Sequence, residues 1–393
     1  MGTGRCFALL LAALPAALWP AQAVSSEGFY AIPDGLRQGP PGVLLKAEPV
    51  APPPGAGAAY RIIYRSRDHA GRPVAISGLV ALPPEGRAGG GRPVVAWGHG
   101  TSGVATRCAP SRDPAQAFAR IGGLSKLMAH GVIVAATDYG GLGEAGQHSY
   151  LLGASEAHAM IDAVRAARRL PGADAGARYA AWGFSQGGHA ALFTAAEARA
   201  YAPELRLAGV AAAAAPTELR RLLRDDIDTL PGQVVASFAA WSWGQAYRLP
   251  LDGIVRPAAQ ATVERIAGDC SLDPLGDVSL GLSALSYGAT GFLRSGADRR
   301  PGWDQLIARN SNPDPKGVPV FFAQGSLDAL VEPATTRDYV GRLCRTGTPV
   351  TYVEVPWASH GGVARAVAPM AVSWLLARLS GAPVPDGCVR AGR

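Results

Sequence analysis

Five residues, Gly183-Phe184-Ser185-Gln186-Gly187 (GFSQG), set the interpretation of this chain. The run 178–182 before them is short and largely apolar, which is typical of a strand, and 186–200 after them is rich in helix-forming alanine. A serine between such a strand and helix, with glycine two residues to each side, indicates a nucleophile elbow, because only small residues fit beside so tight a turn. The elbow would expose the Ser185 hydroxyl at a helix N-terminus, which favours a developing anion.

A nucleophilic serine needs a base, and in the elbow-bearing folds the base follows the serine in the chain. Two of the seven histidines do so, His189 and His360. His189 lies four residues into the elbow helix and would point away from the hydroxyl, so we interpret it as a packing residue. His360 lies in a predicted loop between the strand-like run 350–355 and an amphipathic helix at about 363–379, and we predict that it is the base.

The acid that orients the base is expected between the serine and the histidine. The continuous apolar run 318–323 predicts a buried strand, and Asp328 follows its carboxyl end, one strand before the His360 loop. Glu332 precedes a proline at a predicted helix start and is interpreted as a cap or surface charge, and Asp338 falls inside that helix. Asp328 is therefore the predicted acid.

An oxyanion hole is expected on a glycine-rich loop after an early strand. The run 93–97 predicts a buried strand, and Gly98-His99-Gly100-Thr101-Ser102-Gly103 follows it. We assign one donor to the N–H of Gln186 and the other to the loop, at Thr101 with Gly100 as the close alternative. His99 is interpreted as holding the shape of the loop, and Asp138, after the predicted strand 131–137, as a loop anchor.

Several stretches resemble the secretory lipase family of α/β-hydrolases, which cleave acylglycerols and other carboxyl esters. They are WGHGTSGVATRCAPS (97–111), DYGGLG (138–143), SEAHAMIDAVRAARR (155–169) and GFSQGGHAA (183–191), and the resemblance extends over roughly residues 60–390. It implies that Ser185, Asp328 and His360 form the catalytic triad. It does not fix the length of the acyl group.

The alternation of predicted strands and helices indicates an α/β fold, the α/β-hydrolase fold, with a mostly parallel sheet covered by helices on both faces. We divide the chain into a signal peptide (1–23), an extended N-terminal arm rich in proline (24–59) and a core in two parts (60–215 and 318–393). The strand–helix alternation stops between the two parts. Residues 216–317 are predicted to be an inserted helical cap or lid, whose apolar face would line an acyl pocket or meet a lipid interface.

The first 23 residues have one basic residue, Arg5, then an apolar run, and end on an Ala-Gln-Ala cleavage pattern. They predict export and a secreted or periplasmic product without an integral membrane segment. Loss of Cys6 with this peptide leaves four cysteines, which permit three disulfide pairings. The family resemblance favours Cys108–Cys270 and Cys344–Cys388.

The net charge of +7 is spread along the chain, and no dense basic stripe with interleaved aromatic residues indicates nucleic-acid binding. The cysteine and histidine spacings form no metal motif, and no cofactor is predicted. We therefore expect a secreted serine hydrolase acting on an ester or lipid substrate, most specifically a triacylglycerol lipase, with a lipid–water interface as its further partner. Four other functions fit the same fold: a short-chain carboxylesterase, a peptidase, a polyester depolymerase, and a binding protein without activity.

Overall fold

A nine-stranded sheet forms the centre of the computed structural model, which describes residues 26–85, 91–272, 274–288, 291–384 and 387–388. The predicted signal peptide and Cys6 lie outside these residues. The strand order is β1-β2-β3-β5-β4-β6-β7-β8-β9. The strands are β1 (Leu44–Val50), β2 (Ala58–Arg67), β3 (Pro73–Leu82), β4 (Arg92–Gly98), β5 (Ile133–Thr137), β6 (Ala175–Phe184), β7 (Arg206–Ala213), β8 (Val320–Gly325) and β9 (Val350–Val355).

Strands β1, β2, β3 and β5 pair antiparallel in that order, and all pairs from β5 to β9 are parallel. The mostly parallel sheet of the α/β-hydrolase fold is thus present. The segment that we predicted as an extended arm contains β1 and the short helices α1 (Ser26–Tyr30) and α2 (Asp34–Arg37). Proline is tolerated in β1 because this strand lies at the edge of the sheet, where a missing N–H breaks no ladder.

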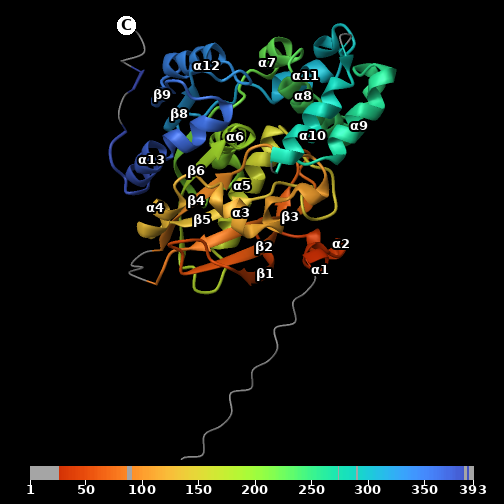
Figure 1. The fold of residues 1–393 in the computed structure, drawn as a ribbon. Helices are drawn as coiled ribbons and strands as arrows, with labels where there is room; N and C mark the ends of the chain where they lie inside the picture. Colours follow the sequence, from red (N-terminus) through yellow and green to blue (C-terminus); the bar gives the residue numbers. More distant parts are fainter. Residues whose placement is uncertain (1–25, 86–90, 273, 289–290, 385–386, 389–393) are drawn as a thin grey trace, which may run out of the picture.

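Helices cover the sheet on both faces (Figure 1). One face packs against α5 (Gly153–Ala167), α6 (Gln186–Tyr201) and α12 (Pro333–Arg345). The other packs against α3 (Pro114–Ala119), α4 (Leu124–Ala129) and α13 (His360–Leu379). Two apolar cores result, because the strands are buried on both sides and their side chains alternate between the faces.

In the part of the chain that the structure describes, five α-helices lie between β7 and β8 and form a layer of their own, drawn in green to cyan in Figure 1. They are α7 (Leu219–Asp226), α8 (Leu230–Tyr247), α9 (Gln260–Gly268), α10 (Pro274–Leu285) and α11 (Trp303–Arg309). Their buried side chains, among them Phe238, Trp243 and Trp303, form a third apolar cluster that also includes Tyr150 and Leu152 of the core. We refer to residues 219–309 as the α7–α11 layer.

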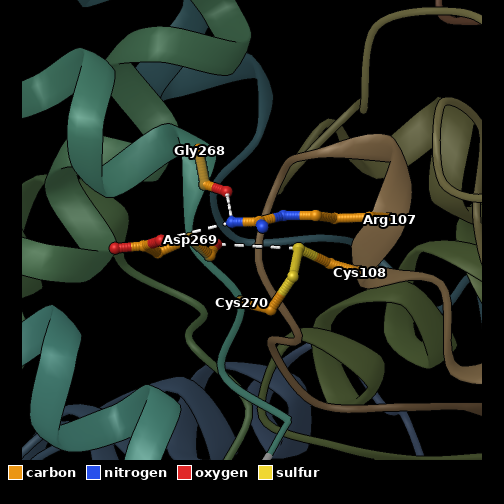
Figure 2. The surroundings of a disulfide bond; sticks show 5 residues. All are labelled: Arg107, Cys108, Gly268, Asp269 and Cys270. Carbon is orange, nitrogen blue, oxygen red and sulfur yellow. Dashed lines mark hydrogen bonds and ion pairs between the residues drawn. A yellow bond between two sulfur atoms is a disulfide. The ribbon is translucent and has the colours of Figure 1, made fainter.

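Two disulfides join distant parts of the chain. Cys108 is bonded to Cys270, which fastens the loop after β4 to the α7–α11 layer, and Cys344 is bonded to Cys388 near the C-terminus. Figure 2 shows that Arg107 lies beside the first bond and reaches across to the same segment, where its guanidinium donates to the Gly268 carbonyl and pairs with Asp269.

Among the helices of the described residues, α13 alone is long and apolar enough to cross a membrane. Half of its apolar window is buried, and Val367, Ala371 and Leu375 pack in the same cluster as Phe321 of β8. This packing makes α13 a core helix of the sheet.

Candidate active site

Ser185 lies at the junction of β6 and α6 with φ 52° and ψ −118°, a conformation that side-chain-bearing residues rarely adopt. Its N–H donates to the Ala213 carbonyl at 2.8 Å, and its carbonyl accepts from the His189 N–H at 3.0 Å. The flanking glycines are required by close backbone contacts. A Cβ at Gly183 would lie 2.0 Å from the carbonyl oxygen of Gly187. The structure therefore has the elbow geometry that the sequence predicts.

His360 connects Ser185 to Asp328 by two hydrogen bonds. Its Nε2 lies 2.9 Å from the Ser185 Oγ, and its Nδ1 lies 2.9 Å from an Asp328 carboxylate oxygen. With the proton on Nδ1, His360 donates to the carboxylate and accepts from the hydroxyl, which is the arrangement that a general base needs. His360 was predicted in a loop. It is the first residue of α13, so the helix begins three residues earlier than its amphipathic pattern indicated.

The Asp328 side chain is fully buried and held by four donors. One carboxylate oxygen accepts the backbone N–H groups of Leu330 and Val331, and the other accepts from the Gln324 amide at 2.7 Å as well as from His360. A carboxylate fixed in this way keeps the imidazole ring in one orientation.

The two rival acids lie in other surroundings. Glu332 occupies the N-cap position of α12, as its interpretation as a cap requires, although its side chain makes no capping bond. Asp338 is largely exposed and pairs with Arg221 at 2.6 Å.

The loop after β4 is held by buried polar contacts. The His99 ring nitrogens lie 2.6 Å from the Gly100 carbonyl and 3.3 Å from the Asp138 carbonyl, and burial lowers the pKa of His99. Asp138 accepts from the Ser77 hydroxyl and from the N–H and hydroxyl of Ser111. Burial raises the pKa of Asp138. Both residues thus anchor the loop, as the sequence indicated.

Of the predicted oxyanion donors, Gln186 follows the serine in the chain, and Gly100 and Thr101 line the same cavity as the serine. Gln186 is the first residue of α6, so its N–H has no acceptor within the helix. Gly100 packs against Phe184, the residue before the serine. Thr101 lines the same cavity as Ser185, and its hydroxyl shares a 2.8 Å hydrogen bond with that of Tyr150.

A buried polar network behind the elbow was not predicted. Glu156 of α5 accepts from the Gln186 amide and contacts the His189 Nδ1, both at 2.8 Å, and the His189 Nε2 lies 2.9 Å from the Asn310 carbonyl. His189 is therefore a buried packing residue. Glu156 falls in the stretch 155–169 that carries the family resemblance, but nothing in its spacing shows that it would reach α6.

Ser185 lies at the meeting point of two cavities. The first has a volume of about 1090 Å³, also includes His360 and Thr101 in its lining, and has charged side chains around it: Arg112, Asp113, Arg120, Lys126 and Arg365. The second is smaller, about 120 Å³, and is lined mainly by residues of the α7–α11 layer. Its walls are mainly apolar, with Leu222, Val235, Trp243, Ile307 and Leu330 among them. We call the first the wide cavity and the second the apolar channel.

Comparison with known proteins identifies the family. The family model described as secretory lipase matches residues 119–387, more than half of the chain. The chain belongs to the secretory lipase family. It is 26% identical over 396 residues to Lipase A of Arthroderma benhamiae, covering 93% of this chain and 81% of that protein. It is also 25% identical over 399 residues to a Mycobacterium tuberculosis protein named "Probable inactive lipase MT1628", covering 93% and 84%.

The fold is shared with solved lipase structures. The X-ray structure of Candida antarctica lipase A superposes with a TM-score of 0.75 at 17% identity and covers 93% of this chain and 89% of that one. The secretory lipase is thus an α/β-hydrolase, and its family makes it a carboxylic-ester hydrolase. Membership of a secretory family and the presence of two disulfides both indicate an extracellular protein. The described residues contain no group of three or more His, Cys, Asp or Glu placed to hold a metal ion.

Proposed function

We propose that this secretory lipase hydrolyses acylglycerols through Ser185, His360 and Asp328 by way of an acyl-enzyme. The observation that carries the proposal is the unbroken chain of two 2.9 Å hydrogen bonds from the Ser185 hydroxyl through His360 to Asp328. The three side chains come from segments up to 175 residues apart in sequence. Their convergence at the end of a helix and between two cavities fits a nucleophile, a base and an orienting acid.

In the first step, the Ser185 oxygen attacks the ester carbonyl while His360 Nε2 takes the hydroxyl proton. Asp328 stabilises the imidazolium that forms. The N–H groups of Gln186 and Thr101 are the proposed donors to the tetrahedral oxyanion, with Gly100 as the alternative on the loop. His360 then protonates the leaving alcohol. Water repeats the sequence on the acyl-enzyme and releases the carboxylic acid and free Ser185.

The two cavities fit the two halves of an acylglycerol. An apolar channel beginning at the serine suits an alkyl chain, since each buried CH₂ group contributes about 0.8 kcal/mol. The wide cavity has room for the glycerol part with its other acyl groups. In this assignment the α7–α11 layer acts as the cap predicted for residues 216–317.

The partner that we propose for the outer face of this cap is a lipid–water interface. Helix α10 exposes a row of four apolar side chains spaced by three or four residues, which places them on one side of the helix. They are Leu275, Val278, Leu282 and Leu285, with exposed fractions of 83, 59, 63 and 57%. Leu280 of the same helix is buried and lines the wide cavity. A lipid surface bound to the exposed row of α10 would therefore lie next to the mouth of the site.

The test is the initial rate on p-nitrophenyl esters from acetate to palmitate and on emulsified triolein, with Ser185→Ala as the control. We expect turnover of long esters and triolein that the variant loses, together with labelling of the unmodified enzyme by a fluorophosphonate. Turnover retained by Ser185→Ala would refute the role of the serine. Activity confined to short esters would make the protein a carboxylesterase, and activity on amides or polyesters alone would make it a peptidase or a polyester depolymerase.

The word "inactive" in the name of the mycobacterial relative applies to that protein. For this chain, the competent residue types at all three positions and their hydrogen-bonded geometry support activity. A protein that folds but neither turns over esters nor reacts with the fluorophosphonate would be a binding protein of the same fold.

A further inference from the structure

Asp226 is a buried carboxyl group in a wall that is otherwise mainly apolar. It is the last residue of α7 and is 6% exposed. Its backbone carbonyl accepts from the N–H and hydroxyl of Thr229, and α8 packs closely upon it, since a Cβ at Gly232 would lie 2.0 Å from that oxygen. The position of Asp226 in the turn between α7 and α8 is therefore tightly fixed.

Asp226 lines the apolar channel together with Ser185, and it also lines an outer pocket of about 470 Å³ together with Thr229 and Ser326. Leu222 of its own helix, Val235 of α8 and Leu330 after β8 line the same channel. Within the described residues, the Asp226 carboxylate has no hydrogen-bond or ion-pair partner. A carboxyl group in this wall that has no hydrogen-bond partner among these residues is free to bind a polar group of a ligand that enters the channel.

Helix α8 presents Gly232 and Val235 to Asp226, and Arg337 and Glu354 line the same outer pocket. Three carboxylates act on the charge of Asp226: Glu332 and Asp328 on the segment after β8, and Asp225 on α7. Burial, and then repulsion from these carboxylates, raises the pKa of Asp226 to about 7. Below neutral pH the group is thus mainly an uncharged carboxylic acid with one donor and one acceptor.

We propose that Asp226 is a specificity-determining residue that binds a hydroxyl group carried on the acyl chain, so that the favoured substrates are esters of hydroxy acids. The inference rests on the proposed function, because it takes the apolar channel as the site of the acyl chain. A hydroxyl can both donate to and accept from the carboxyl group. A plain alkyl chain removes water from the carboxyl group and forms no hydrogen bond with it, so binding of the unsubstituted ester is weakened.

The test compares p-nitrophenyl decanoate with analogues that carry a hydroxyl near the ester, at mid-chain or at the terminal carbon. For the unmodified enzyme we expect one hydroxy ester to exceed the plain ester about tenfold or more in kcat/KM, mainly through KM. Asp226→Leu should bring this ratio close to one by improving the plain ester. Asp226→Asn keeps a donor and an acceptor and should retain most of the preference.

Asp338→Asn is the matched control. It removes a largely exposed carboxylate that pairs with Arg221, lines neither the apolar channel nor the outer pocket and does not act on the charge of Asp226, so the substrate ratio should not change. Thermal unfolding of each variant separates a loss of fold from a change of specificity. The ratio of kcat/KM for the hydroxy ester to kcat/KM for the plain ester is unaffected by a change in the triad that slows both substrates equally.

Three results would overturn the inference: no hydroxy ester preferred by the unmodified enzyme, a preference that survives Asp226→Leu, or a preference for an ammonium group in place of the hydroxyl. Each presupposes ester turnover that Ser185→Ala abolishes. If that turnover is absent altogether, the proposed function has failed rather than the role of Asp226.

Discussion

Gly187→Ala perturbs the closest backbone contact at the elbow. A Cβ on Gly187 would lie 1.8 Å from the carbonyl oxygen of Gly98 and 2.8 Å from that of His99. Real Cβ atoms stay beyond about 3.0 Å, so β4 and the start of α6 would have to separate by more than 1 Å. Both groups are backbone and cannot rotate away. We expect a loss of about 3 kcal/mol in the free energy of unfolding.

The same displacement acts on catalysis, because Ser185 lies two residues before Gly187. A shift of about 1 Å of a reacting group costs on the order of a hundredfold in rate, so kcat/KM on p-nitrophenyl butyrate should fall by at least that factor. The matched control is Gly361→Ala, beside His360, where a Cβ would meet nothing within 4 Å. Urea unfolding and initial rates are measured on both variants. A Gly187→Ala enzyme as stable and as active as the Gly361→Ala enzyme would refute the steric reasoning.

Three further outcomes are expected. Replacing Cys108 and Cys270 by serine opens a link across 162 residues and should lower the free energy of unfolding by about 3 to 5 kcal/mol; an unchanged urea midpoint under oxidising conditions would contradict this. Burial lowers the pKa of His148 from 6.5 to about 3, so as the pH falls the unfolded chain binds this proton at a higher pH than the folded chain. The free energy of unfolding should therefore decrease as the pH drops below 6.5, by about 1.4 kcal/mol per pH unit. His148→Gln should flatten that slope in unfolding titrations, and equal slopes for the two proteins would count against this reasoning. Leu282→Ser should reduce turnover of emulsified triolein and spare soluble p-nitrophenyl acetate, whereas an equal effect on both would exclude α10 as the interfacial helix.

Much of the fold follows from local sequence patterns. The elbow, the predicted strand 350–355 and the helix after Ser185 are found within a residue or two of their expected positions, because each depends on apolar periodicity or on glycine at a tight turn. The N-terminal segment was harder to predict. Its prolines concealed β1, since a strand at a sheet edge tolerates proline and only the pairing with β2 reveals it.

The residue types and chain order of Ser185, Asp328 and His360 are properties of the sequence by itself, as is the family resemblance. Their hydrogen bonds depend on the tertiary structure, because parallel strands β6, β8 and β9 bring their carboxyl ends to one edge of the sheet. The surroundings of Asp226 and Glu156 could be known only from that structure. Burial and the absence or presence of a partner are set by segments far apart in the chain, and no local pattern encodes them.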